Sequence, residues 1–138
     1  MISLLLVDDE KGITDALKIF FEHRGFSVRC ANTGEKALQE VTSHRPDIVF
    51  LDIRMRGMSG LDVLERIKKM DKTIKVIMLT VHEEKEIMER ARELGADEYI
   101  TKPIKGDELS LVIERISWQL MAGENKSAKP GTGLKSGN

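Results

Sequence analysis

The chain contains little of the chemistry that marks several common protein classes. Among its 138 residues there is a single cysteine, Cys30, which excludes an internal disulfide framework and cannot alone form a structural zinc site. Its 22 basic and 23 acidic residues nearly cancel, to a net charge of -1. No overall attraction to nucleic acid or to membranes is therefore encoded, and we expect no direct binding to nucleic acid.

Long apolar segments are missing as well. Residues 2–7 are apolar apart from Ser3, but Asp8, Asp9 and Glu10 follow at once. The start of the chain therefore lacks the basic residues and the long apolar stretch of a signal peptide. No apolar run approaches the ~20 residues of a membrane span. These features predict a cytoplasmic protein without a membrane partner.

Short runs rich in Val, Ile and Leu alternate with segments whose apolar residues have helical spacing. The runs are bounded by polar or turn residues, which favours strands, and the segments between and after them predict five amphipathic helices. The expected strands are residues 2–7, 26–31, 48–51, 76–79 and 99–100.

This order indicates an α/β protein with a (βα)5, doubly wound, five-stranded parallel sheet. Its strands are nearly all apolar, as in parallel sheets that helices cover on both faces. Residues 122–138 contain four glycines and one proline without apolar periodicity. We therefore expect one domain over residues 1–121 and a flexible tail, linker or expression remnant over residues 122–138.

Polar residues stand at the ends of four expected strands. Asp8 and Asp9 follow the first strand, Asp52 the third and Thr80 the fourth, while the fifth runs into Lys102. In α/β proteins, ligands bind at the carboxyl ends of the strands. We expect these five side chains to meet there.

Three carboxylates at one edge repel one another unless a cation lies among them. Mg²⁺ takes oxygen ligands and only one or two carboxylates, so Asp8, Asp9 and Asp52 favour a magnesium site, with Lys102 as a further positive charge. A bound nucleotide phosphate would require glycines and free N–H groups in the first turn. Each acid taken alone is more often a cap or a turn residue, so the prediction rests on their convergence.

The stretches around these residues resemble the receiver domains of bacterial two-component response regulators, over about residues 1–121. The matching stretches are residues 6–10, 47–53, 58–60, 76–80 and 95–103. The resemblance implies a flavodoxin-like fold similar to CheY, with strand order 2-1-3-4-5. It also implies a phosphorylation-activated signalling switch, not an enzyme beyond slow self-dephosphorylation, with a sensor histidine kinase or a phosphotransfer protein as its partner.

The resemblance further implies a role for each acidic residue. Asp52 is the implied phosphoacceptor. Asp9, Asp52 and the backbone carbonyl of Arg54 are the implied direct ligands of Mg²⁺, for which Mn²⁺ can substitute, and Asp8 acts largely through a bound water. The transferred group is anionic and spreads charge over three oxygens in the transition state, which explains the need for a metal and an ammonium group.

The implied switch involves three further residues. Lys102 pairs with Asp52 at rest and with a phosphoryl oxygen afterwards. Thr80 moves its hydroxyl onto the phosphoryl group, and Tyr99 rotates inward from an exposed position, in a two-state population shift. The resemblance also implies a cis bond between Lys102 and Pro103.

Some residues near the site depart from the family pattern or vary within it. Arg56 stands where receivers commonly carry proline, and Val81 where smaller residues are common. Arg54 and His82 occupy positions that influence the access of attacking water, and so the lifetime of the phosphoryl group. Both are equally well explained as exposed surface residues.

The last expected helix offers a candidate output surface. Leu111 and Trp118 lie opposite the apolar face of that helix. Receivers often dimerise or bind effectors through the fourth helix, fifth strand and fifth helix, so a homodimer or effector contact is implied there. Isolated exposed apolar residues are also ordinary.

Two other functions stay open. Aspartate-nucleophile phosphatases also combine Asp, Thr, Lys and an acidic Mg²⁺ site. In that family, however, the nucleophile is the first residue of an Asp-x-Asp motif, and the second aspartate is the general acid and base. That position is Arg54 here. The other alternative function is a receiver-like interaction scaffold that is never phosphorylated. A phosphorylation assay distinguishes it from the switch.

Overall fold

The computed structural model describes residues 1–81 and 85–124. In these residues five strands and five helices alternate along the chain. The strands are β1 (Ser3–Val7), β2 (Ser27–Ala31), β3 (Ile48–Asp52), β4 (Lys75–Thr80) and β5 (Glu98–Thr101). The helices are α1 (Lys11–Glu22), α2 (Gly34–His44), α3 (Gly60–Met70), α4 (Lys85–Glu93) and α5 (Gly106–Glu124).

The strands form one parallel sheet in the order β2-β1-β3-β4-β5. This confirms the predicted α/β class and strand order. Because β1, β3, β4 and β5 run side by side in the same direction, the residues that end them come to the same edge of the sheet.

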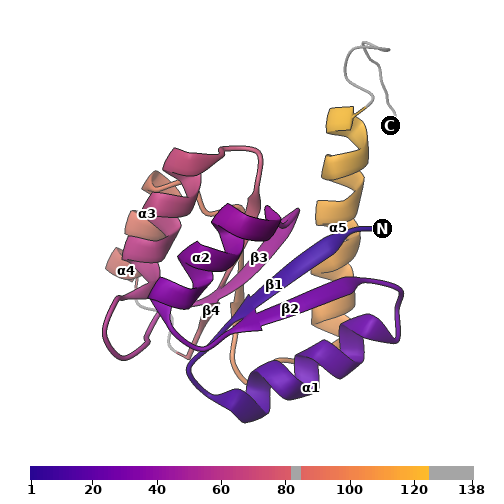
Figure 1. Ribbon diagram of the computed structural model, residues 1–138, viewed down its shortest axis with the longest axis horizontal. Helices are drawn as coiled ribbons and strands as arrows, with labels where there is room; N and C mark the ends of the chain where they lie inside the picture. The colour runs from indigo at the N-terminus through magenta and orange to yellow at the C-terminus, as the bar shows by residue number, and fades with distance from the viewer. Residues whose placement is uncertain (82–84, 125–138) are drawn as a thin grey trace. The chain divides into compact units, whose positions relative to one another are not determined.

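The chain divides into two compact units, Met1–Ile104 and Lys105–Asn138. The first unit contains the sheet and four helices. Within it, α1 covers one face of the sheet, and α2, α3 and α4 cover the other (Figure 1). Helices on both faces explain why the central strands β1, β3 and β4 are almost fully buried. The edge strand β2 differs from the expected apolar run, because its buried residues alternate with the exposed residues Ser27 and Arg29.

The core of the first unit follows the alternation of side chains along the strands. Leu5 of β1 belongs to the same buried cluster as Val41 of α2 and Ile67 of α3. On the face of α1, the ring of Phe21 packs on that of Phe50 with 5.2 Å between their centroids. Successive strand residues point to opposite faces, so β1 and β3 are buried on both sides and form a rigid base for the residues at their ends.

The second unit is described through α5. This helix continues to Glu124, three residues past the expected end of the domain at residue 121. Ala122 has high helix propensity, which lets the helix continue. Among the described residues, no helix combines the length and the apolar character that crossing a membrane would require.

Candidate phosphorylation site

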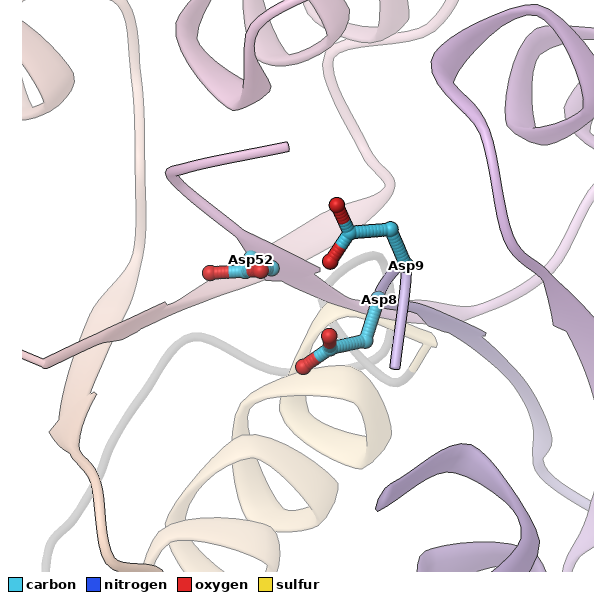
Figure 2. A group of neighbouring side chains, drawn as sticks. All are labelled: Asp8, Asp9 and Asp52. Atoms are coloured by element: carbon cyan, nitrogen blue, oxygen red, sulfur yellow. The ribbon is translucent and has the colours of Figure 1, made fainter. Parts of the chain in front are cut away.

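The carboxyl edge of the sheet brings together three aspartates. Asp8 and Asp9 follow β1 directly, and Asp52 is the last residue of β3. Figure 2 shows their carboxylates lying next to one another, and one ligand oxygen from each lies within 4.8 Å of the other two. We call Asp8, Asp9 and Asp52 the acidic cluster. Their expected convergence is confirmed.

Asp8 is the most enclosed member of the acidic cluster, with 1% of its surface exposed. One carboxylate oxygen accepts a hydrogen bond from the backbone N–H of Glu10 at 3.0 Å. The other accepts one from the Lys102 ammonium group at 2.7 Å. Since both oxygens have partners, Asp8 holds Lys102 in place at the bottom of the site.

Asp52 is buried as well, with 4% of its surface exposed. Its burial, and next the negative charge of Asp8, raise the pKa of Asp52 from 3.8 to about 6, against the opposing effect of Lys102. One carboxylate oxygen accepts a hydrogen bond from the Arg54 N–H at 3.3 Å. At neutral pH the group is therefore an anion with little water around it, which is the state that a carboxylate nucleophile requires.

Lys102 follows β5 and reaches across the edge of the sheet to two aspartates. Its ammonium nitrogen lies 2.7 Å from Asp8 and 3.6 Å from Asp52. The expected pairing with Asp52 is present, but the shorter contact is with Asp8. Burial alone would lower the pKa of Lys102, but the hydrogen bond to Asp8 and the charge of Asp52 more than offset it and raise this pKa. The lysine is therefore a fixed cation.

Asp9 lies at the outer side of the acidic cluster and contacts the loop after β3. The backbone N–H of Arg56 donates a hydrogen bond to its Oδ2 atom at 3.2 Å, and Arg56 Nε lies 3.5 Å from the same oxygen. Proline has no N–H, so the residue that is common here in receivers would not make this hydrogen bond.

Thr80 and Tyr99 are placed by the two strands next to β3. Thr80 ends β4 and is buried, and its carbonyl accepts a hydrogen bond from the Lys102 N–H at 2.7 Å. Tyr99 is half-buried, and its hydroxyl donates to the Met88 carbonyl of α4 at 3.2 Å. The ring is thus partly covered and tied to α4, in contrast to the exposed position expected from the sequence.

Two supporting residues were not singled out from the sequence. The Asn32 side-chain amide donates to the carbonyl of Asp8 at 3.0 Å, which fixes the backbone of the Asp8-Asp9 pair. Gly60 begins α3 against the end of β3, where an added Cβ would lie 2.7 Å from Ile53 Cα. Asn32 directly follows β2, so the rule that collects function at strand ends points to it; the approach at Gly60 is a tertiary contact.

The remaining predicted residues have different outcomes. The Lys102–Pro103 peptide bond is cis, as expected. Leu111 and Trp118 are 59% and 69% exposed on α5. The Arg54 side chain is exposed, and His82 lies outside the described residues.

The acidic cluster fits a hard divalent cation. All three side chains offer oxygen atoms, with spacing short enough to share one ion. Oxygen ligands of this kind suit Mg²⁺ and Mn²⁺ better than soft metals. A lysine already lies against the cluster, so a divalent ion would bring the three carboxylates close to neutrality.

Comparison with known proteins places this geometry in a family. The family model of the response regulator receiver domain matches residues 4–114. The chain is 37% identical over 112 residues to sporulation initiation phosphotransferase F of Bacillus subtilis, covering 81% of this chain and 90% of that protein. It is also 37% identical over 112 residues to the regulatory protein AtoC of Escherichia coli, of which it spans only 24%.

Solved structures agree. A CheY-like receiver domain protein from Methanospirillum hungatei has a TM-score of 0.82 and 30% identity, covering 88% of this chain and 98% of that one. NtrX from Brucella abortus has a TM-score of 0.85 and 33% identity, covering 97% of this chain but 32% of its own. Receiver domains bind Mg²⁺ at an acidic aspartate cluster and are regulatory rather than enzymatic. With its sheet order and its acidic cluster, the chain belongs to the response regulator receiver domain family.

Proposed function

We propose that this chain is a signalling switch in which Asp52 accepts a phosphoryl group. The observation that carries the proposal is the burial of Asp52 beside two further carboxylates and the Lys102 ammonium group. A surface carboxylate has no need of such surroundings. A phosphoacceptor does, because its product carries additional negative charge that cations must stabilise.

The phosphoryl donor in this proposal is a phosphohistidine on a sensor kinase or on a phosphotransfer protein. A carboxylate oxygen of Asp52 forms the new O–P bond while the N–P bond of the phosphohistidine breaks. The imidazole nitrogen keeps the electron pair of that bond and takes up a proton. The product is an acyl phosphate on Asp52, and water can later attack its phosphorus to restore the carboxylate.

Mg²⁺ is the proposed cofactor, and Mn²⁺ can replace it. Asp9, Asp52 and the backbone carbonyl of Arg54 would hold the ion, with Asp8 acting through water. When bound, the ion supplies positive charge to the phosphoryl oxygens. Asp8 has a second task that needs no ion, since its 2.7 Å contact holds Lys102 beside Asp52.

Lys102, Thr80 and Tyr99 form the proposed switch. Lys102 is 3.6 Å from Asp52 before phosphorylation, and it can move its contact to a phosphoryl oxygen afterwards. Thr80 then turns its hydroxyl toward the phosphoryl group, and Tyr99 rotates further inward. That rotation would break the contact between the Tyr99 hydroxyl and the Met88 carbonyl, so α4 is the element that would respond first.

The output is proposed to pass through α4, β5 and α5. Leu111 and Trp118 are exposed apolar side chains on α5 and are the candidates for contact with a second copy or an effector. Arg54 and His82 are candidates for controlling the lifetime of the acyl phosphate. We further propose a domain over about residues 1–121 whose last helix continues to Glu124, a tail or linker after this helix, and a location in the cytoplasm.

Intact-mass spectrometry after incubation with acetyl phosphate and Mg²⁺ tests this function. We expect one added phosphoryl group, lost in Asp52→Ala and in the presence of EDTA. Asp62→Ala is a matched control, because Asp62 lies in the first turn of α3 and outside the acidic cluster, and it should still be phosphorylated. If the native chain gains no phosphoryl group and binds no beryllofluoride, the scaffold function replaces the switch. Repeated turnover of small phosphate esters would instead indicate a phosphatase.

A further inference from the structure

Arg56 is the charged partner of Asp9, although 47 positions separate the two residues. The loop after β3 brings Arg56 back over the end of β1 and turns immediately afterwards at Gly57, whose φ is +79°. Glycine adopts this left-handed conformation without steric conflict. The loop thus presents both the backbone N–H and the guanidinium group of Arg56 to one carboxylate oxygen.

Among the described residues, the ion pairs given for the acidic cluster involve two cations, Lys102 and Arg56. Lys102 lies within ion-pair distance of Asp8 and Asp52, and Arg56 lies within that distance of Asp9. The environments of the two cations differ: the Lys102 side chain is 11% exposed, whereas that of Arg56 is 90% exposed. Lys102 is a fixed part of the site, whereas the Arg56 side chain is surrounded by water.

From this geometry we propose that Arg56 is a tethered counter-cation that competes with the divalent ion for Asp9. The inference rests on the proposed metal site. In the metal-free protein the guanidinium group neutralises Asp9. When Mg²⁺ binds to the acidic cluster, the guanidinium group gives up this pairing and moves into solvent. Arg56 therefore lowers the affinity of the cluster for Mg²⁺.

The two contacts of Arg56 act differently in this exchange. The N–H group is neutral and belongs to the backbone, so it can keep orienting Asp9 when the metal is bound. The guanidinium group is positively charged, and it repels a divalent cation that shares the same carboxylate. Its exposure lets it leave at little cost, since ion pairs in water contribute little stability.

The expected size of the effect follows from this exposure. Exposed ion pairs change equilibria by at most about fivefold, so removing the guanidinium charge should tighten Mg²⁺ binding by about two- to fivefold. Salt screens such pairs, so the difference should shrink at high ionic strength. Because binding linkage is reciprocal, bound Mg²⁺ should weaken the pairing of Arg56 with Asp9 by the same factor.

Isothermal titration of Mg²⁺ into the unphosphorylated chain measures the affinity without any phosphoryl transfer. The variants are Arg56→Gln, which removes the charge, and Arg56→Lys, which keeps it. Arg90→Gln is the matched control, because Arg90 forms an exposed pair with Glu93 at 3.4 Å outside the acidic cluster. Asp9→Asn reports whether binding occurs at this site. Each titration is run at about 0.01 M and about 1 M salt.

Tighter binding in Arg56→Gln at low salt, with Arg56→Lys and Arg90→Gln close to the native chain, supports the proposal. Unchanged affinity in Arg56→Gln overturns it, and weaker binding overturns it in favour of a positioning role for the side chain. In both of these outcomes the native chain still binds Mg²⁺ and Asp9→Asn does not, so the metal site survives. If the native chain binds no Mg²⁺, or Asp9→Asn binds it equally well, the metal site and the inference fall together.

Discussion

Asp97 at the amino edge of the sheet and the acidic cluster at the carboxyl edge have opposite ratios of carboxylates to cations. At the amino edge, Asp97 lies directly before β5 and is 2.9 Å from the Lys68 ammonium group and 3.8 Å from that of Lys75. It also accepts a hydrogen bond from the Val76 N–H at 2.9 Å. One carboxylate thus has two cations and a backbone donor.

At the carboxyl edge, the three carboxylates of the acidic cluster pair with one buried cation and one exposed cation among the residues that the structure describes. The Asp97 group needs no further ion, because its carboxylate already has two lysines and a backbone donor. The carboxyl edge keeps an excess of negative charge beside a buried nucleophile. The ratio of charges, rather than their presence, separates a structural ion pair from a site prepared for a cation and a phosphoryl group.

We expect the largest loss of stability when Asp97 at the amino edge is replaced. Asp97→Ala leaves Lys68, whose side chain is 12% exposed, without its carboxylate partner, and should lower the free energy of unfolding by about 2–4 kcal/mol. Mg²⁺ affinity should not change, because Asp97 lies at the other edge. Urea unfolding and Mg²⁺ titration measure the two quantities.

Glu65→Ala is the control for this prediction, since the Glu65–Lys69 pair on α3 is exposed and should contribute less than about 1 kcal/mol. Equal losses from Asp97→Ala and Glu65→Ala, or a strong effect of Asp97→Ala on Mg²⁺ binding, would remove the proposed division between the edges.

A smaller loss of stability is expected where α3 touches the site. In Gly60→Ala the new Cβ would lie 2.7 Å from Ile53 Cα, so the backbone that carries Asp52 must shift. Overpacking of this kind lowers stability by about 1–3 kcal/mol, and a displaced nucleophile should slow phosphorylation by about tenfold or more. Urea unfolding and the mass assay with acetyl phosphate provide both values.

Gly12→Ala is the matched control, because a Cβ at Gly12 in α1 meets no atom within 4 Å and alanine favours helices. It should leave phosphorylation unchanged and stability equal or higher. Normal phosphorylation of Gly60→Ala would show that the end of β3 tolerates movement.

A gain in stability, instead of a loss, is expected at the acidic edge. Without metal, Asp52→Asn removes a buried negative charge and should raise the free energy of unfolding at pH 7.5 by about 1–3 kcal/mol. Saturating Mg²⁺ should make the unsubstituted chain more stable than Asp52→Asn, because the variant lacks one of the carboxylates proposed to bind the ion. Thermal unfolding with and without Mg²⁺ tests both statements.

The pH dependence of this gain has a definite sign. The pKa of Asp52 rises from 3.8 to about 6 on folding, so between these values the folded state binds more protons than the unfolded state. Stability that depends on Asp52 therefore falls as pH rises through this window, and the loss is complete about one pH unit above the folded-state pKa. The advantage of Asp52→Asn should vanish near pH 4. An advantage that is constant with pH would show that Asp52 has no raised pKa.

Much of the fold and the site was predictable, because it depends on the apolar pattern of short segments and on their order along the chain. Apolar runs and helical spacing predicted the elements, and parallel strands bring their ends to one edge, so the meeting of Asp8, Asp9 and Asp52 followed. Expected strand boundaries were less exact. Only residues 99–100 were expected of β5, but Glu98 and Thr101 also pair with β4, since ladder hydrogen bonds use the backbone and do not require apolar side chains.

By itself the sequence determined the class of fold, the edge at which function collects, and the residues of the acidic cluster, because strand direction and residue order suffice for these. The tertiary structure decided which partners those residues have. Lys102 lies nearer to Asp8 than to Asp52, Tyr99 is tied to α4, and Arg56 reaches Asp9. Such contacts join residues distant in sequence, and their lengths depend on how loops and side chains pack after the strands have come together.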